Sequence, residues 1–155
     1  MMMLVRAAKA SDIPAMKKLV LESPRAAQWS DDAYQSFFKS SRPVGRQVLV
    51  AEESGVVLGF IAASGIDSEW ELENAVVAGE SRQKGIGKQL VGELLKLAHE
   101  HHASAIHLEV RESNQPARGL YESCGFHKSG RRKAYYAGPR EDAILYCFSF
   151  SSPEK

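Results

Sequence analysis

The stretch Arg82-Gln83-Lys84-Gly85-Ile86-Gly87-Lys88 joins a predicted strand to a predicted helix, and the rest of the fold follows from it. Residues 72–77 before it are typical of a strand, and after it apolar side chains recur at helical spacing from Ile86 to Ala98. Glycines at 85 and 87 let the backbone approach a ligand closely, and the first amides of a helix have no partner within it. With the helix dipole and the flanking cations, this pattern predicts a phosphate or pyrophosphate site.

Two other glycine-rich phosphate loops fit this stretch poorly. A Walker loop requires Ser or Thr where this chain has Gln89, and the dinucleotide-binding pattern requires a third glycine where it has Leu90. A tight strand-to-helix turn that binds nothing is the alternative for two glycines alone. The hypothesis of an anion site therefore needs support from the rest of the chain.

The composition predicts a single domain, residues 1–155, of ordinary globular character. The chain has 155 residues, of which 44% are hydrophobic and 25% charged, enough for a full core. A net charge of +1 argues against a general nucleic-acid or membrane-surface binder. Cys124 and Cys147 form no Cys-x-x-Cys pattern and are expected as free buried thiols, and the apolar run at the start is too short for a signal peptide. These features together predict a cytoplasmic protein.

The order of the predicted elements defines the fold class. Strands are predicted at 4–7, 47–53, 56–64, 69–77, 105–110, 126–129 and 142–150. Helices are predicted after a Ser11 cap, from Ser30 through Phe38, after the glycine loop, and at 114–123 before Gly125, with a turn-rich segment at 135–139. The crossover through the long helix favours parallel pairing in the second half. The expected class is α+β, with a mixed, mostly antiparallel central sheet flanked by helices.

Two titratable residues of the second half are candidates for chemistry. Glu109 faces away from the apolar side chains of the strand at 105–110, and a carboxylate near the end of a buried strand is costly unless it is paired or functional. An ion pair with Arg111 or Lys133 is the non-catalytic alternative. Tyr121, on the short helix, is either a core aromatic residue or a functional phenol.

The sequence around these residues resembles a known family. The runs are Leu108-Glu109-Val110-Arg111-Glu112-Ser113-Asn114 and Leu120-Tyr121-Glu122-Ser123-Cys124-Gly125-Phe126, and residues 82–87 match Arg/Gln-x-x-Gly-x-Gly. They resemble the GNAT superfamily of N-acetyltransferases. Arg131-Arg132 to Tyr135-Tyr136 and Arg140 to Ile144 are similar to its RimI-type branch, which acetylates the N-terminal alanine of a small-subunit ribosomal protein. One departure is Ala78-Gly79-Glu80-Ser81, where relatives often have Asp-Pro and an aromatic residue.

The resemblance implies the GNAT fold, acetyl-CoA as co-substrate and a role for each matching residue. Glu109 is implied as the proton acceptor and Tyr121 as the proton donor. Asn114 is implied to contact the cofactor. The backbone of Ala75, Val76 and Val77 is implied to pair with the pantetheine arm. The implied pyrophosphate loop consists of Gln83, Lys84, Gly85, Ile86, Gly87 and Lys88.

Three aromatic residues are candidates for the acceptor groove. Trp29 and the pair Tyr135-Tyr136 are large amphipathic side chains in segments predicted as loops, and loops often carry binding residues. They either hold the first residues of a peptide or have structural roles. In the structural alternative, Trp29 is a hydrophobic staple for the following helix and the tyrosines cap the core.

These residue types suit acetyl transfer to an amine without a metal. An α-amine has a pKa near 8, so a carboxylate can take its proton and a phenol can protonate the departing thiolate. His99 and His102 share a helix face without a third ligand, which indicates a cationic helix end. The sequence thus predicts an acetyl-CoA-dependent acetyltransferase acting on a protein N-terminus, with no nucleic-acid or membrane partner. Two alternatives stay open: a small-molecule amine acetyltransferase, and a non-enzymatic acetyl-CoA-binding domain, against which Glu109 and Tyr121 argue.

Overall fold

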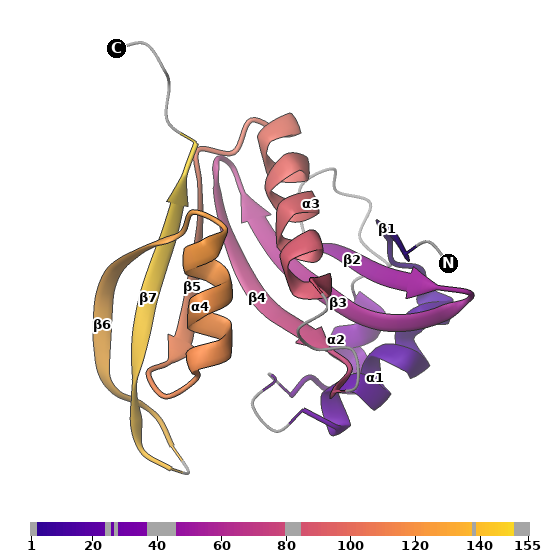
Figure 1. Ribbon diagram of the computed structural model, residues 1–155, viewed down its shortest axis with the longest axis horizontal. Coiled ribbons are helices and arrows are strands. Elements are labelled where there is room, and N and C mark those ends of the chain that lie inside the picture. The colour runs from indigo at the N-terminus through magenta and orange to yellow at the C-terminus, as the bar shows by residue number, and fades with distance from the viewer. Residues whose placement is uncertain are drawn as a thin grey trace.

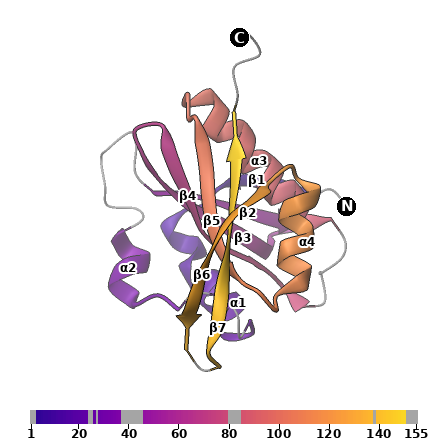
Figure 2. The ribbon, with the colours of Figure 1, turned by 90° about the vertical axis from the view of Figure 1, so that its left-hand side faces the viewer.

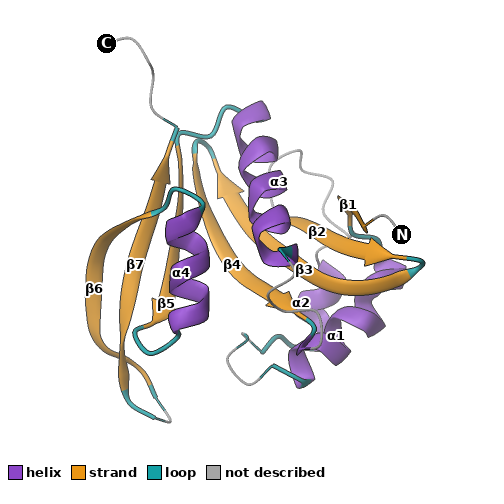
Figure 3. Cartoon of the chain, viewed as in Figure 1, coloured by secondary structure: helices purple, strands orange, loops and turns teal. Residues whose placement is uncertain are grey.

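A computed structural model describes residues 3–23, 26, 28–36, 46–79, 85–137 and 139–150 as one sheet with helices on both faces (Figure 1 and Figure 3). The strands are β1 (Met3–Ala7), β2 (Arg46–Glu53), β3 (Val56–Ile66), β4 (Glu69–Val77), β5 (Ala105–Arg111), β6 (His127–Tyr136) and β7 (Glu141–Ser149). The helices are the 3-10 turn η1 (Ala10–Asp12), α1 (Ile13–Leu21), α2 (Asp31–Ser36), α3 (Ile86–Glu100) and α4 (Gln115–Ser123). The predicted α+β class is confirmed.

The sheet is antiparallel except at its centre. The strand order is β1-β2-β3-β4-β5-β7-β6, and β4 and β5 form the parallel pair. They are parallel because α3 carries the chain back along the sheet between them. The predicted parallel pairing after the glycine loop is therefore confirmed.

The parallel pair formed by β4 and β5 is short. Its ladder joins Glu69–Glu71 to Ala105–His107, and beyond these residues the two strands diverge (Figure 1). The register of β4 against β3 also shifts by one residue at Glu73, which marks a β-bulge. A bulge bends its strand and increases the local twist, and this contributes to the divergence. The C-terminal half of β4 consequently leaves the side of β5.

Two apolar clusters fill the space between the sheet and its helices. Figure 2 shows α1 and α2 on the opposite side of the sheet from α3 and α4. Leu90 and Leu94 of α3 pack with Trp70 and Leu72 of β4 in one cluster, while Val76 of the same strand packs with α1 in the other. The strand can serve both clusters because the extra residue of the bulge switches the face that alternate side chains reach.

The beginning of the first helix differs from the prediction. Ser11 lies inside the turn η1 instead of capping a helix, so that prediction is wrong. The carboxylate of Asp12 provides the cap in place of Ser11. It accepts a hydrogen bond from the Lys9 amide at 2.7 Å and pairs with Arg6 at 2.9 Å. A buried carboxylate bound on both sides fixes this corner more firmly than an exposed serine hydroxyl would.

The last hairpin is longer than predicted. The sequence predicts a strand at 126–129 and a turn at 135–139, whereas β6 extends from His127 to Tyr136. The placement of Tyr135 and Tyr136 in a loop is therefore wrong, because both are strand residues. Most side chains of β6 are exposed and its register with β7 shifts twice, so the sequence lacks the alternating pattern that would have identified the strand.

The predictions for Gly125, the two cysteines and the second helix have different outcomes. Gly125 adopts φ +99° just after α4, as predicted for a left-handed helix terminator. Cys124 and Cys147 are free thiols, as predicted, but they are only partly buried. Phe37 and Phe38, the predicted end of the second helix, lie outside the described residues. In the part of the chain that the structure describes, no helix is long and apolar enough to cross a membrane.

Candidate active site

Glu109 lies on β5 just after this strand has separated from β4. Ile106, Leu108 and Val110 point into the cluster beneath α3, so Glu109 points to the opposite face, as the alternation predicts. Its side chain lines a cavity of about 360 Å³. The bend of β4 and the alternation of β5 thus place one carboxylate at the wall of an open space.

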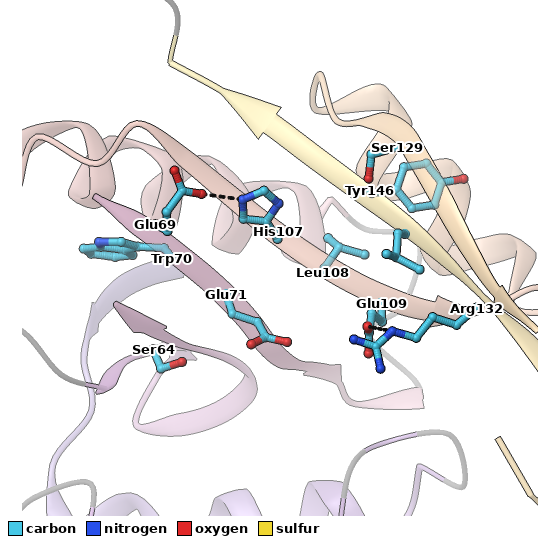
Figure 4. A pocket seen from close by; sticks show the side chains of 11 residues that line it. Ser64, Glu69, Trp70, Glu71, His107, Leu108, Glu109, Ser129, Arg132 and Tyr146 are labelled. Atoms are coloured by element: carbon cyan, nitrogen blue, oxygen red, sulfur yellow. Dashed lines mark hydrogen bonds and ion pairs between the residues drawn. The ribbon is translucent and has the colours of Figure 1, made fainter. Parts of the chain in front are cut away.

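Three carboxylates lie on the lining of the cavity (Figure 4). Its charged or titratable residues are Glu69, Glu71, His107, Glu109, Arg132 and Tyr146. Glu69 is already engaged, because its Oε1 lies 2.6 Å from His107 Nε2 and its Oε2 accepts a hydrogen bond from Ser104 at 3.0 Å. These contacts, that with His107 above all, hold the pKa of Glu69 below its usual range. Glu71 and Glu109 remain as the carboxylates on the walls farther from this pair (Figure 4).

Glu109 forms an ion pair, but with neither of the predicted partners. Arg132 Nε lies 2.8 Å from Glu109 Oε2, so the prediction of Arg111 or Lys133 is wrong. Arg111 shares the strand of Glu109, but its guanidinium turns to the end of the β6–β7 hairpin and binds Glu141 at 3.2 Å. The side chain of Glu109 is 19% exposed and that of Arg132 is 55% exposed. The guanidinium therefore covers the carboxylate from the solvent side.

Sequence reasoning missed Arg132 as a residue of this site. The run Arg131-Arg132 was a visible signal, since it is part of the segment that resembles one branch of a known family. Nothing in the sequence shows which of the two arginines faces Glu109, because the register of β6 shifts on both sides of this pair.

Tyr121 lies on α4, within the apolar cluster beneath α3. Its ring packs against Phe126 with centroids 5.7 Å apart. Burial raises the pKa of its hydroxyl, and the nearby Cys124 and Tyr136 add to the effect. The phenol is consequently protonated at neutral and mildly alkaline pH, so it can donate a proton but not act as a base.

The tyrosine pair at the end of β6 lies close to Glu109. Burial raises the pKa of Tyr136, and the neighbouring charge of Glu109 raises it further. The ring of Tyr136 is half-buried, with the Arg111 guanidinium 4.4 Å from its centroid, whereas Tyr135 is exposed and carries Arg132 at 4.9 Å. The structure therefore brings both tyrosines into the region of the candidate base.

The described part of the glycine loop has the geometry of an anion site. Gly85 precedes α3 with φ +82°, a conformation that favours glycine, and a Cβ there would meet no atom within 4 Å. Ile86, Gly87 and Lys88 form the first turn, whose amides have no intrahelical partner, and the Lys88 side chain is exposed. The open backbone and the cation at a helix N-terminus fit a pyrophosphate. Gln83 and Lys84 lie outside the described residues.

Gly87 has a packing role as well. A Cβ at this position would lie 3.1 Å from Leu120 Cδ2 and 3.9 Å from Val77 Cγ2. The first turn of α3, the end of β4 and the middle of α4 therefore meet at this glycine. Because Tyr121 follows Leu120 on α4, this contact also fixes the candidate proton donor relative to the glycine loop.

The remaining candidates for cofactor contacts lie around the divergence of the strands. Ala75, Val76 and Val77 belong to the half of β4 that pairs with β3 on one edge and has left β5 on the other. Asn114 caps α4, and its Oδ1 accepts a hydrogen bond from the Ala117 amide at 3.3 Å. Its side chain has a structural role whatever else it binds.

Trp29 lies in the cluster on the other face of the sheet. Its ring packs edge-on against Tyr34, with centroids 5.5 Å apart, and lies 6.2 Å from that of Phe60. Ser30 accepts a hydrogen bond from the Ala33 amide at 3.2 Å, so Trp29 and Tyr34 have the spacing of a hydrophobic staple around a helix cap. In the described part of the chain, the residues that line the Glu109 cavity do not include Trp29.

The described residues contain no group of three His, Cys, Asp or Glu side chains placed to hold a metal ion. His99, near the end of α3, stacks on Phe150 with ring centroids 5.7 Å apart. His102 follows in the turn after the helix, with φ +63°. Both histidines thus lie at the C-terminal end of the helix, where a cation is favoured.

Comparison with known families agrees with this architecture. The model of the acetyltransferase (GNAT) family matches residues 13–126, and because this is most of the chain, the protein belongs to that family. The predicted family resemblance and the predicted GNAT fold are therefore confirmed.

Three comparisons, two by sequence and one with a solved structure, give the degree of similarity. A Bacillus subtilis protein named putative ribosomal protein bS18-alanine N-acetyltransferase is 34% identical over 97 residues, which are 63% of this chain and 64% of that protein, less than two thirds of its length. The Escherichia coli bS18-alanine N-acetyltransferase is 29% identical over 143 residues, 91% of this chain and 93% of the relative. The crystal structure of the ribosomal-protein-S18-alanine N-acetyltransferase from Escherichia coli superposes with a TM-score of 0.81 at 27% identity, covering 99% of both chains.

Proposed function

We propose that this protein transfers the acetyl group of acetyl-CoA to the N-terminal α-amine of a protein, with the N-terminal alanine of a small-subunit ribosomal protein as the acceptor. The observation that carries the proposal is the position of Glu109, at the wall of a cavity beside the divergence of β4 and β5. Similarity over 91% of the chain to the Escherichia coli bS18-alanine enzyme supports the choice of acceptor.

The elements around this cavity provide a binding site for acetyl-CoA. The edge of β4 at Ala75, Val76 and Val77 suits an extended pantetheine arm, because a strand that has lost its neighbour presents backbone groups along that edge. Residues 83–88 at the start of α3 suit the pyrophosphate, and the Asn114 side chain suits a further polar contact. When bound there, acetyl-CoA supplies a thioester carbonyl as the electrophile.

Glu109 and Tyr121 then each transfer one proton. Glu109 takes a proton from the acceptor ammonium, which frees the nitrogen lone pair to attack the carbonyl carbon. As the carbon–sulfur bond breaks, Tyr121 gives its proton to the departing sulfur, and the new amide nitrogen releases its second proton to water. Exchange with water afterwards returns a proton to Tyr121 and removes one from Glu109. The raised pKa of Tyr121, caused mainly by burial, suits a group that must begin as the acid.

The acidic lining favours a second candidate acceptor, a small polyamine. Glu69, Glu71 and Glu109 place three carboxylates on one cavity of about 360 Å³. A panel of acceptors separates the two functions: a peptide that begins with alanine, the same peptide with a blocked N-terminus, a blocked peptide with one lysine, and spermidine. We expect mass spectrometry to find the acetyl group on the alanine nitrogen alone. Preferential acetylation of spermidine would overturn the protein-acceptor proposal.

The proposed acetyl-CoA site predicts that the charge at position 88 affects acetyl-CoA binding. Lys88→Glu should weaken acetyl-CoA binding by roughly tenfold, because it replaces an attraction to phosphate by a repulsion at an exposed site. Calorimetry at low and high salt measures it, and the deficit should shrink with salt. Lys96→Glu, farther along the same helix, is the matched control and should bind normally. Equal losses in both variants would mean that only the net charge of the protein matters.

The proposed acceptor groove predicts that Tyr135, which is 48% exposed, contributes to peptide binding. Tyr135→Ala should raise the KM for peptide several-fold and leave that for acetyl-CoA unchanged, because the lost contacts belong to the acceptor alone. Since Arg132 stacks on this ring, the comparison is repeated in the Arg132→Ala background. Lys133→Ala, two residues earlier on the strand, is the control. A matching rise in both KM values with a lower melting temperature would assign Tyr135 to the fold.

A further inference from the structure

The ion pair between Arg132 and Glu109 carries an inference that rests on the proposed role of Glu109. We propose that Arg132 is a reversible cap on this carboxylate, which the acceptor amine displaces when it arrives as a cation. The acceptor ammonium takes the position of the guanidinium, and Glu109 then removes its proton. Arg132 thereby selects amines that are cationic at neutral pH over amines that are neutral.

The contacts of two neighbouring arginines differ from those of Arg132 and support the proposal of a displaceable cap. Three arginines lie at the base or along the sides of the β6–β7 hairpin. Arg111 binds Glu141 and also donates to the carbonyl oxygens of Ala137 and Pro139, at 3.1 Å each. Arg131 binds Asp142 at 2.7 Å and Glu112 at 3.0 Å. Both therefore tie the hairpin to neighbouring elements.

Arg132 is held much less firmly. In the described part of the chain its guanidinium has one ion pair, through Nε to Glu109 at 2.8 Å, and one ring contact, with Tyr135 at 4.9 Å. The side chain is 55% exposed, so water screens its attraction to the carboxylate. Stacking on Tyr135 offers a position for the guanidinium beside the site once the ion pair has opened. The contact is thus strong enough to form and weak enough to exchange.

The charge of the incoming group decides whether the exchange is favourable. Glu109 is mostly covered, and a covered carboxylate that loses its counter-ion is destabilised. An ammonium restores that charge balance, whereas a neutral amine does not. An α-amine, with a pKa near 8, is mainly cationic at neutral pH, so it can replace the guanidinium directly. Glu71, on the same cavity, adds to the attraction for a cation.

A binding experiment tests the cap without any acetyl transfer. Methylammonium serves as a minimal acceptor and is titrated into the protein while the amide resonances of β5 are followed by NMR. We expect Arg132→Ala to bind it roughly three to five times more tightly than the wild type, because an exposed ion pair contributes little. Arg132→Lys keeps a cation and should behave as the wild type does. Lys133→Ala, the adjacent cation, should also be unchanged.

The double variant Arg132→Ala/Glu109→Gln shows where methylammonium binds. It should lose the gain, because the carboxylate that attracts the cation is gone. Equal binding by the wild type and Arg132→Ala, or a gain that survives Glu109→Gln, overturns the proposal.

A kinetic experiment connects the cap to the acceptor. Arg132→Ala should lower the KM for an alanine-terminated peptide by a similar factor, with the KM for acetyl-CoA unchanged. The preference for that peptide over an aminooxy-terminated analogue, which is neutral at pH 7, should shrink. A higher peptide KM in Arg132→Ala would show that Arg132 binds the acceptor directly and overturn the cap. Absence of acetylation by the wild type would contradict the proposed function, and the methylammonium titration would still decide the cap.

Discussion

Glu109→Gln should lower the turnover of peptide acetylation by roughly 10²-fold or more at neutral pH, because the amide keeps the shape of the side chain and loses its basicity. Acetyl-CoA affinity should stay nearly unchanged, since Glu109 points to the face of β5 opposite α3, whose N-terminus carries the glycine loop. Steady-state kinetics with an alanine-terminated peptide and calorimetry with acetyl-CoA measure the two effects. Glu71→Gln, a second carboxylate of the same cavity, is the matched control and should retain most of the turnover.

The pH dependence separates a base from a structural carboxylate. Only the neutral amine attacks, and an α-amine with a pKa near 8 is about one tenth neutral at pH 7 and about nine tenths neutral at pH 9. The loss caused by Glu109→Gln should therefore shrink by up to about tenfold over this interval, because the acceptor then needs less help to lose its proton. A defect of the same size at both pH values would assign Glu109 to the structure.

The same substitution also removes the partner of Arg132, and this effect has to be separated. Removing Arg132 should not reproduce the loss of turnover, because the cap does not itself move a proton. Arg132→Ala/Glu109→Gln should be as slow as Glu109→Gln alone. A double variant that regained turnover would mean that the unpaired guanidinium, and not the lost base, had blocked the reaction.

The parts of this site that follow from local periodicity could be predicted from the sequence. Alternation along residues 105–110 placed Glu109 on the face opposite the apolar cluster, and the glycines at 85 and 87 identified the start of α3. Each of these patterns is complete within a dozen residues and depends on one element. The apolar faces of the strand and the helix fix them, whatever the rest of the chain does.

The parts that depend on register could not be predicted. The bulge at Glu73, which contributes to the divergence of β4 from β5, has no sequence marker such as a glycine. The partner of Glu109 depends on how β6 aligns with β7, and two register shifts there bring Arg132 to the carboxylate in place of Lys133. An exposed strand has no buried face to fix its register, so the sequence contains little information about it.

Tyr121→Phe should lower turnover by roughly 10²-fold while the fold stays intact, because it removes one oxygen and keeps the ring that packs against Phe126. The raised pKa of Tyr121, caused mainly by burial, adds a second expectation. The phenol should remain protonated well above neutral pH. The wild type should therefore lose no turnover at alkaline pH through ionisation of Tyr121. Pre-steady-state measurement of the chemical step tests both, since slow product release would otherwise hide the effect.

Tyr146→Phe is the matched comparison, and its effects should be the reverse. The Tyr146 hydroxyl donates to Glu122 at 2.6 Å and accepts from Arg118 at 3.0 Å, so its loss should reduce the stability of the fold by about 1 kcal/mol. Turnover should change little, because both contacts tie β7 to α4 and the substitution keeps the ring of Tyr146 at the cavity wall. If Tyr121→Phe instead lowered the melting temperature and kept full turnover, Tyr121 would be a core aromatic residue, and the departing thiolate would need another source of its proton.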